Sequence, residues 1–134
     1  MKAIDKLLLL VQDESLGIDD WSDVFVIEAI KLAETLSQPD EIEKCLQIAP
    51  SLDPNAQIRL YEVICSLPLV DMFMSFVPLL SHGNIEIAEV IFDGLRFWPL
   101  EPSQKKELLS AIHCFRGQSK LLDLCIDNFS SSII

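Results

Sequence analysis

The feature of this sequence that most constrains its fold is a series of short segments in which apolar residues recur every three or four positions. Each segment is closed by proline, glycine or a run of small polar residues, and no segment sustains the alternation of a β-strand. Helical spacing therefore predicts helices over residues 3–12, 19–36, 38–49, 54–67, 70–80, 85–98, 102–116 and 120–129. Because the breaks between these segments are short, consecutive helices are expected to pack antiparallel.

The segments predict an all-α fold of about eight short antiparallel helices, built either as an array of helical hairpins or as an irregular bundle. A chain of 134 residues is long enough to bury one core, so we expect a single domain spanning residues 1–134. Residues 130–134 form a tail to which the pattern assigns no element.

Residues of known capping and helix-breaking type mark several of the helix ends. Asp53, which is followed directly by proline, is expected to cap the fourth helix, and Asn84 and Ser119 are expected to cap the sixth and eighth. Pro78 has no backbone N–H to donate, so it should kink the fifth segment or end its regular hydrogen bonding. The apolar stretch from Val63 to Leu80 is not expected to cross a membrane, because it contains both this proline and a central aspartate.

Two segments share a weak internal similarity. Residues 57–64 match residues 84–91 at a spacing of 27, in one glutamate and several apolar positions. Either a true structural repeat or the chance likeness of two amphipathic helices would produce this match.

Helical hairpins of this length, a proline early in one helix as at Pro78, and acids at the turns give the region from Asp19 to Phe129 a resemblance to a degenerate HEAT or armadillo-type array. The small, acidic, helical chain also resembles bacterial immunity proteins, including those of contact-dependent growth inhibition systems. This second resemblance implies a protein that neutralises a toxin by binding it. Both resemblances are of type, and neither assigns a role to a particular residue.

The charge is one-sided, with 21 acidic against 10 basic residues and a formal net charge of −11. Such a chain is poorly suited to nucleic acid or to an anionic membrane surface, both of which require basic residues. It is suited to a basic protein partner, although acidity for solubility alone is the competing interpretation. Residues 1–62 hold thirteen acids and five bases, whereas residues 63–134 hold eight acids and five bases, so the electrostatic face is expected in the N-terminal half.

In a stack of alternating helices, several acidic helix starts are expected to fall on one edge. Trp21 lies within this acidic sequence, either as an aromatic anchor for a partner or as a core residue. Phe97 and Trp98 are a second aromatic candidate, with packing of a helix end as the alternative. The predicted partner-binding residues are Asp13, Glu14, Asp19, Asp20, Trp21, Asp23, Asp53 and Glu86.

No pattern of catalytic or metal-binding residues is evident. His82 and His113 lack a nucleophile at a productive spacing, the acidic run after residue 12 lacks the ligand spacing of a calcium loop, and no phosphate-binding glycine loop occurs. We therefore expect no enzyme activity, no cofactor and no metal. The cysteines at positions 45, 65, 114 and 125 lie in apolar stripes and are expected to be reduced core residues, which indicates a cytoplasmic protein.

The sequence therefore favours a non-catalytic protein-binding domain. The leading hypothesis is an immunity protein that binds a basic toxin domain, such as a nuclease, through an acidic surface. The alternative is a helical-repeat scaffold or adaptor that binds a peptide or a partner subunit.

Overall fold

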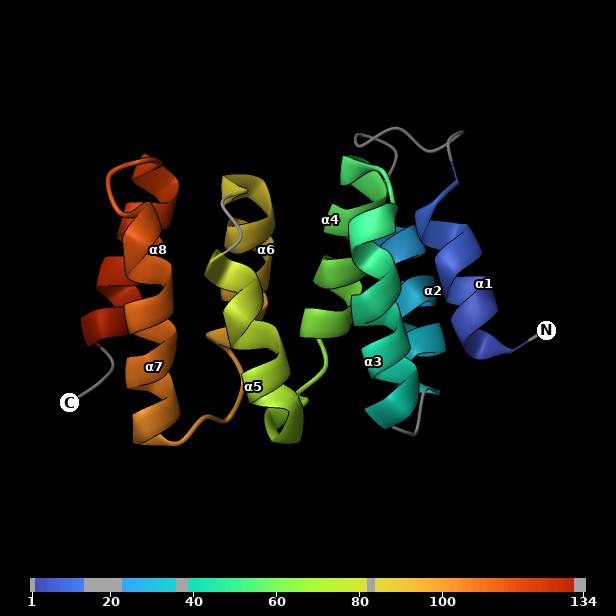
Figure 1. Ribbon diagram of the computed structural model, residues 1–134, viewed down its shortest axis with the longest axis horizontal. Coiled ribbons are helices and arrows are strands. Elements are labelled where there is room, and N and C mark those ends of the chain that lie inside the picture. Colours follow the sequence, from blue (N-terminus) through green and yellow to red (C-terminus); the bar gives the residue numbers. More distant parts are fainter. Residues whose placement is uncertain (1, 14–22, 36–38, 82–83, 132–134) are drawn as a thin grey trace. The chain divides into compact units, whose positions relative to one another are not determined.

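The chain is all-α in a computed structural model that describes residues 2–13, 23–35, 39–81 and 84–131 (Figure 1). Within these ranges there is no strand, as the sequence predicts. The α-helices are α1 Ala3–Val11, α2 Asp23–Glu34, α3 Pro39–Ile48, α4 Pro54–Cys65, α5 Phe73–Phe76, α6 Ile85–Leu95, α7 Pro102–Ile112 and α8 Lys120–Ser131. Short 3-10 turns follow or flank several of them, at Ala49–Ser51, Val70–Met72, Val77–Ser81 and His113–Phe115.

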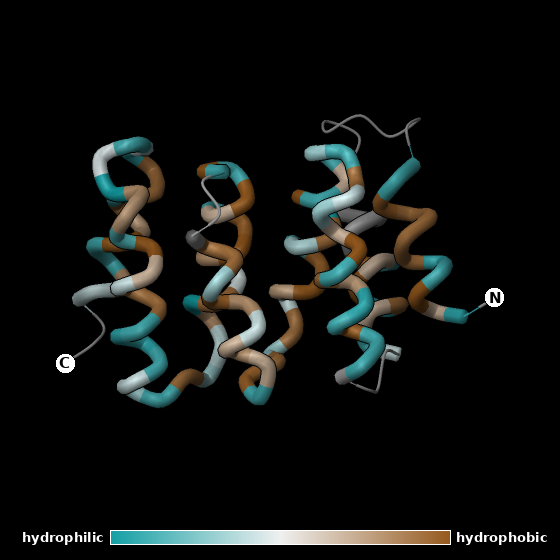
Figure 2. The backbone as a smooth tube through the Cα atoms, viewed as in Figure 1, coloured by the Kyte–Doolittle hydropathy of each residue, from teal (hydrophilic) through white to brown (hydrophobic). Residues whose placement is uncertain are grey.

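The contacts of the chain divide it into two compact units, unit 1 (Met1–Leu67) and unit 2 (Pro68–Ile134). Unit 1 contains α1 to α4, and unit 2 contains α5 to α8. The single domain expected from the length stays a prediction. Hydrophobic and hydrophilic stretches follow one another along the helices of each unit, as in amphipathic helices (Figure 2).

Unit 1 is built on the mutual packing of α1, α2 and α4. Ala29 and Ala33 lie one turn apart on α2 and are fully buried, and their small side chains let α2 approach its neighbours closely. Leu7 of α1 and Leu60 and Ile64 of α4 fill the space between the three helices and are also fully buried. Burial of each such aliphatic side chain contributes roughly 1.5–3 kcal/mol, so the apolar faces hold these short helices together.

Unit 2 buries a more aromatic core. Phe76 packs edge-to-face on Trp98 with ring centroids 5.3 Å apart, and Phe92 packs in the same way on Phe129 at 5.6 Å. The second contact joins α6 to α8, which are not adjacent in the chain. In Figure 1, α6 and α8 begin at the same end of the unit, and α7, which joins them in the chain, runs in the opposite direction.

The segment around Pro78 behaves as its chemistry requires. Only Phe73–Phe76 is α-helical, and 3-10 turns precede and follow it. Because proline cannot donate the hydrogen bond that would continue the α-helix, the predicted interruption is confirmed. No helix in the described part of the chain is both long enough and apolar enough to span a bilayer.

The predicted capping residues are confirmed. A side-chain oxygen of Asp53 accepts hydrogen bonds from the backbone N–H groups of residues 55 and 56, at 3.0 and 3.1 Å. Asn84 caps α6 in the same way, at 3.0 and 3.3 Å, and the Ser119 hydroxyl accepts from Leu122 at 3.3 Å. These bonds satisfy N–H groups that have no partner inside the helix.

Several predicted helix ends are wrong. The helices expected over residues 54–67 and 85–98 end at Cys65 and Leu95. The helix expected over residues 102–116 ends at Ile112, and a 3-10 turn and then Gly117, at a φ of +91°, complete the reversal. Helix α8 continues to Ser131, into the tail that the sequence left unassigned.

The helix pairs begin at similar intervals along the chain. Their first elements start at Ala3, Pro39, Val70 and Pro102, which are 36, 31 and 32 residues apart. The capping residues Asp53 and Asn84 are 31 residues apart, not the 27 of the sequence match. Since the difference of four residues is about one helical turn, an apolar stripe matches itself at either spacing.

We predict that Asp53→Ala lowers the free energy of unfolding by about 1 kcal/mol, because the first-turn N–H groups of α4 lose their acceptor. Urea unfolding followed by circular dichroism measures the change. Asp53→Asn keeps the side-chain acceptor and serves as the control, so an equal loss in both variants would contradict the capping role.

Candidate functional site

The structure brings part of the predicted acidic surface together. Asp13 follows the C-terminal end of α1 and Asp53 precedes α4, and both side chains are exposed. These two helix ends, together with the start of α2 at Asp23, lie at the same end of unit 1 (Figure 1). We call Asp13 and Asp53 the acidic end of unit 1.

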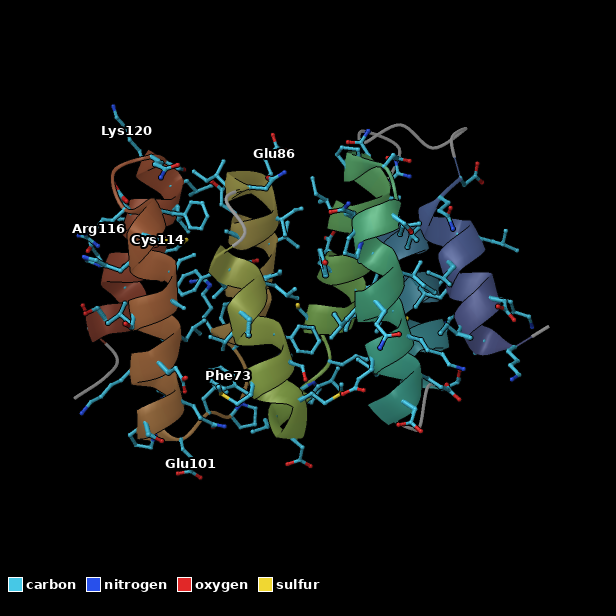
Figure 3. The ribbon with its side chains drawn as sticks, in the orientation of Figure 1. Phe73, Glu86, Glu101, Cys114, Arg116 and Lys120 are labelled. Atoms are coloured by element: carbon cyan, nitrogen blue, oxygen red, sulfur yellow. The ribbon has the colours of Figure 1, made fainter. Side chains whose placement is uncertain are left out.

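The other predicted site residues are placed differently. Glu86 is an exposed first-turn residue of α6 and belongs to unit 2, where it points outward at the same end as Lys120 of α8 (Figure 3). The side chain of Asp23, and Glu14, Asp19, Asp20 and Trp21 as whole residues, lie outside the described residues.

A buried arginine, which sequence reasoning missed, ties α4 to the acidic end. Arg59 is only 6% exposed, and its Nη1 donates hydrogen bonds to the carbonyl oxygens of Val11 at 3.1 Å and Asp13 at 3.4 Å. The guanidinium thus satisfies carbonyls at the negative end of the α1 dipole. The sequence held one indication that Arg59 is special, because it is the only lysine or arginine between Lys44 and Arg96.

Unit 1 exposes fewer basic side chains than its composition indicates, because Arg59 is buried. The unit holds thirteen acids and five bases, and the four bases other than Arg59 are exposed lysines at positions 2, 6, 31 and 44. Lys31 approaches Glu28 at 3.9 Å, but both side chains are more than 60% exposed, so this pair contributes little. Among the described carboxylates of the unit, those of Asp5, Glu34, Asp40 and Glu43 are exposed to water.

The arginines of unit 2 are bound to its own carboxylates. Arg96 donates from Nε and Nη2 to one oxygen of Asp93, at 3.1 and 2.8 Å. Arg116 donates to Asp127, and this hydrogen bond is the main cause that raises the pKa of the guanidinium. Figure 3 places Arg116 on the outside of the unit, beside α8.

Helices α6 and α8 enclose a groove of about 350 Å³ that the sequence did not predict. Phe92 and Leu122 are almost fully buried and form its floor, whereas Leu121 is 69% exposed at its edge. The full lining is Glu89, Val90, Phe92, Asp93, Arg96, Leu121, Leu122 and Cys125. An apolar floor with a few charged groups at the rim is typical of a binding site.

The two adjacent aromatic residues at the end of α6 have different environments. Trp98 is 4% exposed and packs on Phe76, so the packing alternative holds for it. Phe97 is 74% exposed, and the guanidinium of Arg96 lies 4.5 Å from its ring centroid.

The expectation of four core cysteines is correct for two of them and wrong for the others. Cys45 and Cys65 are buried, and burial raises the pKa of the Cys45 thiol to about 11 and also raises that of Cys65. Cys114 is exposed because α7 ends before it, and Cys125 is half-buried at the groove.

The described residues contain no group of three or more His, Cys, Asp and Glu side chains placed to hold a metal ion. His113 is exposed in the turn after α7, and His82 lies outside the described residues. The expected absence of a cofactor and of enzyme activity stays a prediction.

Comparison with known proteins gives no relative for this chain. No family model matches it, and no curated protein or solved structure is significantly similar to it.

We predict that Arg59→Met lowers the free energy of unfolding by about 1.5–3 kcal/mol, because buried carbonyls at the end of α1 lose a charged donor. Lys44→Met removes the same charge from an exposed position and should change stability by less than about 0.5 kcal/mol. Urea unfolding provides the measurement. Equal effects of the two substitutions would show that the hydrogen bonds of Arg59 are unimportant.

Thiol labelling of the native protein should follow exposure. A maleimide reagent is expected to modify Cys114 first and Cys125 more slowly, while Cys45 and Cys65 react only after unfolding, because burial protects them and disfavours their thiolates. Peptide mass spectrometry of timed samples identifies each site. Early labelling of Cys65 would contradict the described core of unit 1.

Proposed function

We propose that this chain is a non-catalytic protein-binding domain that binds a basic protein through its acidic surface. Within that class we propose an immunity protein, which covers the cationic surface of a toxin domain and so neutralises it. The observation that carries the proposal is the charge of unit 1, in which thirteen acids stand against four exposed lysines because the fifth base, Arg59, is buried.

Electrostatic complementarity explains why such a surface suits a nuclease toxin. A nuclease domain needs a basic surface to hold its phosphate backbone, and an acidic protein that docks there competes directly with the substrate. Unlike charges also steer the two proteins together, which raises the association rate. An immunity role would place the chain in the cytoplasm, where its cysteines stay reduced.

The acidic end of unit 1 is the part of the surface that we propose makes first contact. Asp13 and Asp53 come from different helix pairs, and Arg59 fixes the chain after α1 against α4. A preorganised surface loses less conformational entropy on binding than a flexible one.

A second candidate function is a helical-repeat scaffold that binds an apolar peptide. It is supported by the spacing of 31 to 36 residues between the starts of successive helix pairs. Peptide binding in an apolar groove would be insensitive to salt, whereas the capture of a basic toxin would weaken as salt increases.

Co-expression tests the immunity proposal directly. Each product of a gene adjacent to that of this chain is expressed in a toxin-sensitive host, with and without the chain. We expect one adjacent product to be a basic, growth-inhibiting protein whose toxicity the chain removes by forming a stoichiometric complex. Adjacent products that are all harmless, or a toxin that remains active beside abundant chain, would contradict the proposal.

With that partner, Asp13→Asn together with Asp53→Asn should slow association about tenfold at low salt, because two charges leave the acidic end while asparagine keeps the cap of α4. The matched control is Asp5→Asn with Glu34→Gln, which removes the same charge from exposed positions at the other end of unit 1. Stopped-flow measurement gives both rates. Equal slowing would assign the effect to net charge and contradict a localised contact.

A further inference from the structure

The groove between α6 and α8 combines an apolar interior with one unbalanced negative charge. Its walls are the half-buried side chains of Val90 and Cys125, above the buried rings and methyl groups of Phe92 and Leu122. An apolar chain placed there would remove these groups, and the exposed Leu121 at the edge, from water.

The charged groups of the groove differ in how they are satisfied. Asp93 and Arg96 neutralise one another through two hydrogen bonds, and the guanidinium also lies against the Phe97 ring. Glu89 lines the groove one turn before Asp93, and in the part of the chain that the structure describes no basic side chain forms an ion pair with it. The groove therefore has a net charge of −1 that is centred on Glu89.

The surroundings of Glu89 reinforce this sign. Glu86 lies one turn earlier on the same helix, so Glu86, Glu89 and Asp93 follow one another at helical spacing. Lys120 is the basic residue at the start of α8, and its side chain extends outward from the end of the unit (Figure 3).

We propose that this groove takes a lysine side chain of the basic partner. The methylene stem would lie against Val90, Leu121 and Leu122, and the ammonium group would meet the carboxylate of Glu89. A lysine has this division between an apolar stem and a charged end. An anion would be repelled by Glu89, and a purely apolar side chain would leave this half-buried carboxylate without a partner.

The inference rests on the proposed function in taking a basic protein as the source of the lysine, but it can be tested without that protein. The probe is the n-hexylammonium ion, which has an aliphatic chain and a cationic end. Neutral n-hexanol and anionic n-hexanoate are the matched probes of similar length. Each is titrated into the full chain, and the methyl NMR signals of Val90, Leu121 and Leu122 report on the groove.

We expect n-hexylammonium to shift these signals with a dissociation constant on the order of 10 mM, about two- to fivefold tighter than n-hexanol. Hexanoate should cause no shift. Glu89→Gln should abolish the preference for the ammonium ion over the alcohol. The control Glu107→Gln removes an exposed carboxylate of α7 outside the groove and should leave the preference unchanged.

Equal binding of the alcohol and the ammonium ion to the unaltered chain would overturn the inference, as would binding of hexanoate or shifts confined to other residues. Loss of the preference in both variants would also overturn it, since the effect would then follow net charge. None of these results bears on the acidic end of unit 1. Failure of the groove and failure of the proposed function are therefore distinguishable.

Discussion

The closing of apolar helix faces on one another is the interaction on which this structure depends. None of the described helices exceeds twelve residues, and helices of that length are marginal in water on their own. Their stability comes from tertiary burial, through the alanines of α2 against α1 and α4 in unit 1 and through the paired aromatic rings in unit 2. Side-chain caps such as Asp53 and Asn84 complete the helix starts, where backbone groups would otherwise lack partners.

This arrangement determines where charge is found. Most apolar side chains of the described helices are buried or half-buried, none of the described acidic residues is buried, and the one arginine of unit 1 is. Arg59 binds carbonyls at the end of α1, and the consequence of its burial is that all exposed basic side chains of unit 1 are lysines. The proposed function follows from this consequence. A surface with few exposed cations attracts a basic partner and repels nucleic acid.

Local signals in the sequence were enough to predict the helices, because periodicity, capping side chains and proline act within a few residues of where they occur. Asp53, Asn84 and Pro78 behave as their chemistry requires. The end of α7 was missed by about one turn, because the apolar spacing continues into the 3-10 turn, and that error also misplaced Cys114 in the core. Of the predicted acidic surface, Asp13 and Asp53 are described at one end of unit 1 and Glu86 belongs to unit 2, and the surface as a whole stays a prediction.

Features that depend on long-range contacts could not be predicted in this way. The role of Arg59 requires α4 to lie beside the end of α1, and the groove requires α8 to lie beside α6 although α7 separates them in the chain.

The proposed function depends most directly on the claim that charge attraction holds the complex together. That claim is tested by the dissociation constant of the complex with the partner between about 50 and 500 mM NaCl. Because opposite charges attract the two proteins, affinity is expected to fall steeply and continuously over this range. Affinity that stays constant would contradict it and would favour an apolar mode of binding.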